Sequence, residues 1–98
     1  MTSITTDYQI IAQRMTHIAR QLKPGFEVDM RMVFKCERIR EYALVTIRDT
    51  NQKFDDEIVY LESFTEGKGD AIEFCDKVFS FCFEKNMFKR PIDLIILN

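Results

Sequence analysis

The sequence predicts an α+β fold of order αβββαβ, with two helices packed on one face of an antiparallel sheet of three or four strands. Two stretches with apolar residues at helical spacing flank three stretches in which apolar and polar residues alternate. The connections between the alternating stretches are short, which favours antiparallel neighbours. A chain of 98 residues, 46% hydrophobic and 31% charged, fits a single domain, residues 1–98, with one core.

The first helix is expected at about residues 3–22. Apolar residues recur there at intervals of three and four, which gives one apolar face. They are Ile4, Tyr8, Ile11, Met15, Ile18 and Leu22, with Ala12 and Ala19 widening the stripe. Thr5 or Thr6 is expected to cap the start, and Gln9 would complete a capping box with Thr6. Pro24-Gly25 should end the helix.

Three strands should follow this helix. Residues 26–36 are apolar at every second position, which predicts a half-buried strand. Residues 42–48 predict a second strand, and the turn residues at 49–53 separate it from a third strand at about 56–64. One face of the second strand is then Ala43, Val45 and Ile47.

A second helix and a last strand complete the expected fold. Gly67-Lys68-Gly69 predicts a loop, and Asp70 should cap the helix that follows, with Glu73 as its capping-box partner. This helix is apolar over most of its circumference, and Asn86 should end it. The apolar run 92–97 is expected to pair at the sheet edge or against the first strand.

The sequence contains no pattern typical of an enzyme, a metal site or a cofactor site. His17 is its only histidine, and no two cysteines stand at the close spacing of a zinc site. The three cysteines, Cys36, Cys75 and Cys82, are an odd number without a signal peptide, so we expect reduced core residues in a cytoplasmic protein. No apolar run reaches the 18 residues or so that a membrane span needs.

Negative charge is concentrated in residues 49–76. This segment holds nine acids against two lysines, a net charge of −7 in a chain whose total is −2. The acids are Asp49, Asp55, Asp56, Glu57, Glu62, Glu66, Asp70, Glu73 and Asp76. Rows of carboxylates on a strand and a helix, about 6.7 Å and 4.5 Å apart, would imitate part of a DNA phosphate ladder. We therefore expect these nine residues to bind a basic protein surface, although capping alone would also explain the three on the helix.

The small size, the αβββαβ order and the acidic 55–76 region resemble the anti-CRISPR proteins of phages and mobile elements. The resemblance is to inhibitors of type I-F surveillance complexes, some of which are DNA mimics. It implies binding to the basic DNA-binding surface of CRISPR effector subunits and blocking of target DNA in the host cytoplasm. It implies no cofactor, no small-molecule substrate, no direct contact with nucleic acid or membrane, and no turnover.

Two other functions stay open at this point. The chain would be an adaptor or homo-oligomer if 92–97 or the exposed side of the second helix were its interface. The αβββα order and Gly67-Lys68-Gly69 also resemble the double-stranded RNA-binding domain, but Asp70, Ala71 and Ile72 replace that family's lysines. A degenerate nucleic-acid-binding domain would use the basic residues Arg14, His17, Arg20, Arg31, Lys35, Arg38 and Arg40.

Overall fold

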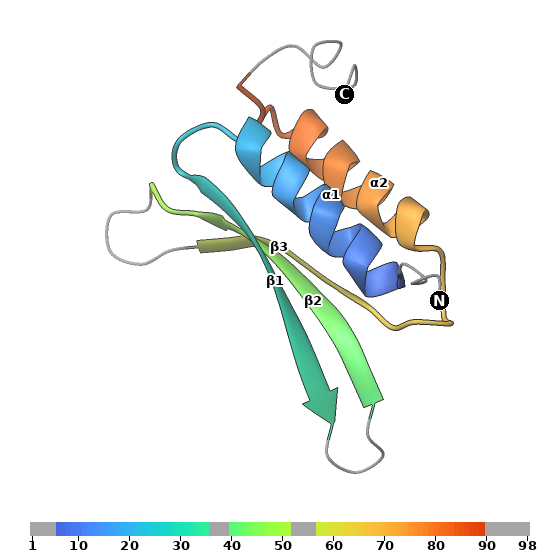
Figure 1. Cartoon of the computed structure of the whole chain (residues 1–98). Coiled ribbons are helices and arrows are strands. Elements are labelled where there is room, and N and C mark those ends of the chain that lie inside the picture. Colours follow the sequence, from blue (N-terminus) through green and yellow to red (C-terminus); the bar gives the residue numbers. More distant parts are fainter. Residues whose placement is uncertain (1–5, 36–39, 52–56, 90–98) are drawn as a thin grey trace.

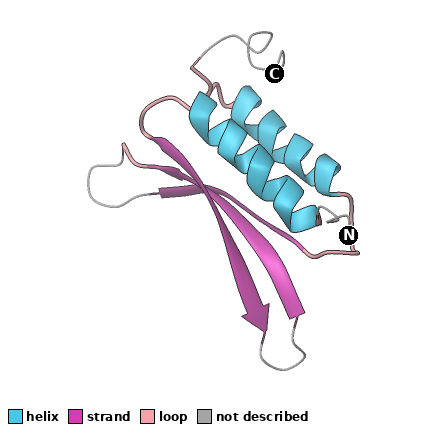
Figure 2. Ribbon diagram, in the orientation of Figure 1, coloured by secondary structure: helices cyan, strands magenta, loops and turns pink. Residues whose placement is uncertain are grey.

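Two helices lie over one face of a three-stranded antiparallel sheet in the computed structural model, which describes residues 6–35, 40–51 and 57–89 (Figure 1, Figure 2). The elements in chain order are α1 Asp7–Gln21, β1 Phe26–Lys35, β2 Arg40–Asp49, β3 Glu57–Phe64 and α2 Ala71–Glu84. The strands are ordered β1-β2-β3. This α+β architecture confirms the prediction, and the strand expected at 92–97 lies outside the described residues.

Local chemistry sets both ends of α1. The Gln9 backbone N–H donates to Thr6 Oγ1 (3.2 Å) and the Thr6 N–H donates to Gln9 Oε1 (2.8 Å), so the expected capping box is present. The helix ends at the extended residue Leu22. Gly25 follows with φ +100°, and a Cβ there would collide with the Asn51 side chain, so this turn requires glycine.

Helix α2 ends in a Schellman motif around Asn86. The Asn86 N–H donates to the Phe83 carbonyl (3.1 Å), and the Met87 N–H donates to the Cys82 carbonyl (2.9 Å). Asn86 has φ +56°, a left-handed conformation that asparagine tolerates better than most residues. The predicted helix terminator is therefore confirmed.

The residues after α2 run alongside the end of α1. The Lys23 N–H donates to the Met87 carbonyl (2.8 Å), and the Lys89 N–H donates to the Gln21 carbonyl (2.8 Å). An isolated antiparallel bridge joins Leu22 to Phe88 between these two bonds. The two helices consequently point the same way, with their last residues at the same end of the molecule (Figure 1).

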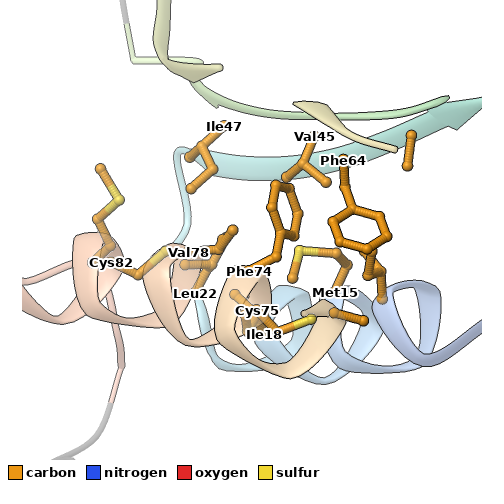
Figure 3. Close-up of a cluster of buried hydrophobic side chains, with 14 of the residues drawn as sticks. Met15, Ile18, Leu22, Val45, Ile47, Phe64, Phe74, Cys75, Val78 and Cys82 are labelled. Carbon is orange, nitrogen blue, oxygen red and sulfur yellow. The ribbon is translucent and has the colours of Figure 1, made fainter. Parts of the chain in front are cut away.

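The core fills the space between the helices and the sheet (Figure 3). Ala43, Val45 and Ile47 of β2 are fully buried there, as their alternation predicts. Cys75 and Cys82 are buried too, and burial raises the pKa of each thiol to about 11, with Arg14 and Asp76 acting in opposite directions on Cys75. Both are core residues and neither is a thiolate nucleophile near neutral pH.

Four apolar positions do not match the expected burial. Met32 and Phe34 of β1 are 36% and 63% exposed, because the β1–β2 hairpin extends beyond the ends of the helices (Figure 1). Ala19, which the apolar stripe of α1 predicts to be packed, is exposed, and so is Ala12. Strand β2 also begins earlier than expected, at Arg40.

Candidate interaction surface

A tight turn carries the chain from β3 to α2. The Lys68 N–H donates to the Thr65 carbonyl (3.0 Å), and Gly67 occupies the third position with φ +84°. This hydrogen bond and this glycine are the signature of a type II turn. The turn sets the distance between the acids at the end of β3 and those at the start of α2.

Asp70 is the N-cap of α2. Its Oδ1 accepts from the backbone N–H groups of Ile72 (2.8 Å) and Glu73 (3.2 Å), as the sequence predicts. The expected return bond from the Asp70 backbone to the Glu73 side chain is absent from the described hydrogen bonds. Asp70 therefore stabilises the helix, while the exposed Glu73 carboxylate faces solvent.

Tyr8 fixes the loop that precedes α2. Its hydroxyl donates to the Glu41 carbonyl of β2 (2.9 Å) and accepts from the Glu66 N–H (3.0 Å). Its ring meets Phe64 edge-on, with centroids 6.2 Å apart. The sequence predicts Tyr8 only as one of the apolar residues of α1. The signal for its second role is the hydroxyl itself, because a tyrosine in an apolar stripe usually needs a polar partner.

Two aromatic contacts hold β3 against α2. Phe64 packs on Phe74 with ring centroids 5.6 Å apart, and Tyr60 packs on Phe81 at 4.7 Å. Glu62 lies between Tyr60 and Phe64 on the same side of the strand, because side chains alternate. The Glu62 carboxylate is therefore exposed beside α2 on a strand that is fixed on both sides of it.

Three of the nine predicted acids meet at one hollow between β3 and α2. Glu62, Asp70 and Glu73 line this hollow of about 200 Å³, and we call these three residues the acidic surface. Lys68 and Lys77 line the same hollow. The structure thus combines acids from a strand, a helix cap and a helix, with two lysines that reduce the local negative field.

The other acids lie elsewhere. Asp49 and Glu57 are cross-strand neighbours at the far end of β3, and Glu57 is roughly 16 Å along the strand from Glu62. Glu66 is exposed in the loop between Glu62 and Asp70 and does not line the hollow. Asp76 acts on Cys75, which faces the core near Arg14 of α1, and it does not line the hollow. Asp55 and Asp56 lie outside the described residues.

Among the basic residues of the alternative function that the structure describes, those of α1 and that of β1 lie on opposite sides of the sheet. Arg14 and Arg20 are exposed on α1, which covers the inner face of the sheet. Arg31 pairs with Leu44 and therefore points to the opposite face from the buried Val45. The side chains of Lys35, Arg38 and Arg40 lie outside the part of the chain that is described.

Comparison with known proteins finds no protein-family model, curated protein or solved structure that matches this chain. Within the described ranges, no cluster of three or more His, Cys, Asp or Glu side chains has metal-binding geometry. No helix in those ranges is long and apolar enough to cross a bilayer.

Proposed function

We propose that the protein is a stoichiometric inhibitor whose acidic surface binds the basic nucleic-acid-binding surface of a host protein assembly. The observation that supports it best is the meeting of Glu62, Asp70 and Glu73 at one hollow. Residues 57–76 carry six acids and one lysine, so the wider region is strongly negative as well. A region of this charge attracts arginine and lysine side chains that otherwise hold phosphate.

The rigidity of the surface favours tight binding. Glu62 is on a strand and Glu73 is in the first turn of a helix, and the Phe64–Phe74 contact joins the two elements. Carboxylates on fixed elements lose less conformational entropy on binding than carboxylates on a flexible tail. Arginine can bind a carboxylate with two parallel hydrogen bonds, which gives the contact a defined geometry.

The resemblance to anti-CRISPR proteins supports one target for this surface. The DNA-binding groove of a type I-F surveillance complex is the basic surface that we propose, and occupation of the groove would exclude target DNA. The mechanism needs neither a cofactor nor turnover. Because charge pairs carry the contact, binding should weaken as salt rises.

A competition assay tests this proposal. Target DNA binding by the purified surveillance complex is measured by fluorescence anisotropy with increasing amounts of the protein, at low and at moderate salt. The variant E62K/E73K should inhibit about tenfold less well or worse, because it replaces two attractions with two repulsions. The variant E27K/E84K makes the same change of charge on exposed residues away from the hollow and should inhibit like the wild type.

The lysines of the hollow provide a test in the opposite direction. The variant K68Q/K77Q removes the two positive charges beside the acidic surface and should inhibit more strongly than the wild type. Two results would refute the proposal: unchanged DNA binding at saturating protein, or equal inhibition by E62K/E73K and E27K/E84K.

A further inference from the structure

The outer edge of β1 has no strand partner among the described residues, and the pairing of β1 with β2 is regular. Strand β1 is the first of the three described strands across the sheet, and it pairs with β2 over ten consecutive residues without a register shift. It contains no proline. Long, regular edge strands that contain neither a bulge nor a proline pair readily with another chain.

The opposite edge is protected. Strand β3 has a register shift against β2, where Tyr60 pairs with Ile47 and Ile58 pairs with Arg48. The resulting bulge, together with the charges of Glu57 and Glu62, disrupts and repels a further strand. Of the two described edges, β1 is therefore the one suited to strand pairing.

The two halves of the β1 edge differ in shape. Met32 and Phe34 protrude in the second half, beyond the cover of the helices, and Phe34 is 63% exposed. The first half borders a hollow of about 390 Å³, which we call the edge hollow. Its lining residues are Ala19, Phe26, Glu27, Val28, Asp29 and Arg48. A two-fold axis at the middle of the strand would place each protrusion at the other copy's hollow.

We propose that a second copy of this chain pairs antiparallel with β1, with Met30 of each copy opposite the other on the two-fold axis. In this register Asp29 lies opposite the partner's Arg31, and Arg31 lies opposite the partner's Asp29. Both side chains are exposed on the same face of the sheet. Opposite charges at directly paired positions stabilise a sheet.

The same register matches the apolar side chains of the other face. Phe34 lies opposite the partner's Phe26 at the edge hollow, and Met32 lies opposite the partner's Val28. Met32 and Phe34 are thus covered by the first half of the partner's β1, which is the half that lies under the helices. Burying them stabilises the pair, since apolar area removed from water contributes about 25 cal/mol per Å².

Neighbouring registers are worse. If one strand slides by two residues along the other, either Asp29 faces the partner's Asp29 or Arg31 faces the partner's Arg31. Like charges at directly paired positions destabilise a sheet. A slide of one residue puts the apolar face of one copy beside the polar face of the other. Of the Met30 register and its two neighbours at a two-residue slide, only the one with Met30 on the two-fold axis contains no like-charge pair.

This pairing is independent of the proposed function. The new contact uses the β1 edge, whereas the acidic surface is formed by β3 and α2 at the other edge of the sheet. The six-stranded sheet would carry two acidic surfaces, one on each side. The variant E62K/E73K should therefore leave the dimer intact while it weakens inhibition.

Charge reversal with rescue tests the pairing. Sedimentation equilibrium on the full chain should give twice the 11.7 kDa of one copy. D29R alone and R31D alone each create two like-charge pairs and should weaken dimerisation at least about tenfold. An equal mixture of the two variants restores both opposite-charge pairs and should dimerise again, and so should the double variant D29R/R31D.

The controls separate a lost contact from a lost fold. E84R makes the same change of charge on an exposed residue of α2 and should dimerise like the wild type. Unfolding of a single variant would also appear in D29R/R31D, which carries both changes. Three results would overturn the proposal: a wild-type monomer at about 1 mM protein, dimers that survive both single reversals, or a mixture that stays monomeric.

Discussion

Replacing Tyr8 with phenylalanine removes one oxygen atom that joins three parts of the fold. The hydroxyl bonds β2 through the Glu41 carbonyl and the loop before α2 through the Glu66 N–H, at 2.9 Å and 3.0 Å. Each bond contributes about 0.5–1.5 kcal/mol. Glu66 is exposed and water can replace its lost partner, so Tyr8→Phe should lower the free energy of unfolding by about 1–2 kcal/mol in total. The edge-on contact of the ring with Phe64 is retained.

Urea unfolding followed by circular dichroism measures this loss. In thermal unfolding followed by the same signal, the melting temperature of a domain of this size should fall by about 5–10 °C. Tyr60→Phe is the matched control, because the Tyr60 hydroxyl makes no hydrogen bond among the described residues and its ring keeps its contact with Phe81. It should change stability by less than about 0.5 kcal/mol. Equal losses in the two variants would refute the structural role of the Tyr8 hydroxyl.

Two further predictions concern the end of α2 and the buried thiols. Asn86 has φ +56°, so Asn86→Gly should stabilise the protein and Asn86→Ala should destabilise it, by about 0.5–1 kcal/mol each, and equal urea midpoints for both would contradict the left-handed cap. In a Cys36→Ser background, Cys75 and Cys82 should resist a thiol reagent at pH 8 in the folded protein and react in denaturant, since burial raises the pKa of each to about 11. Because these folded pKa values lie above the ordinary 9.0, their contribution to stability is full below pH 9 and is lost as the pH rises toward 11. A Cys75→Ala/Cys82→Ala variant should lose less stability over that range, and equal slopes of stability against pH would contradict the prediction.

The sequence predicts those parts of this fold that local chemistry determines. The capping box of Thr6, the cap of Asp70 and the terminator Asn86 each depend on atoms a few residues away, and all three are present. The alternation in β2 likewise gives its buried face, because a period of two fixes which side chains share a face.

The features that the sequence does not predict depend on where one layer ends over another. The period of β1 assigns Met32 and Phe34 to the inner face, but it cannot show that the helices stop before reaching them. The charge count of residues 49–76 likewise does not show which of these side chains come together in the folded protein. Only the contact of β3 with α2 reveals that Glu62 meets Glu73 at one hollow, and that Asp76 does not line it.

The bridge between Leu22 and Phe88 determines how the protein can be attached to a support. It holds Lys89 at the end of α2, whereas Asp70 and Glu73 lie at its start, and a helix of 14 residues is about 21 Å long. A biotin or fluorophore attached at the exposed position 89 therefore lies at the end of the molecule remote from the acidic surface. Such a handle leaves that surface facing solution, which makes this the preferred site for immobilised binding measurements.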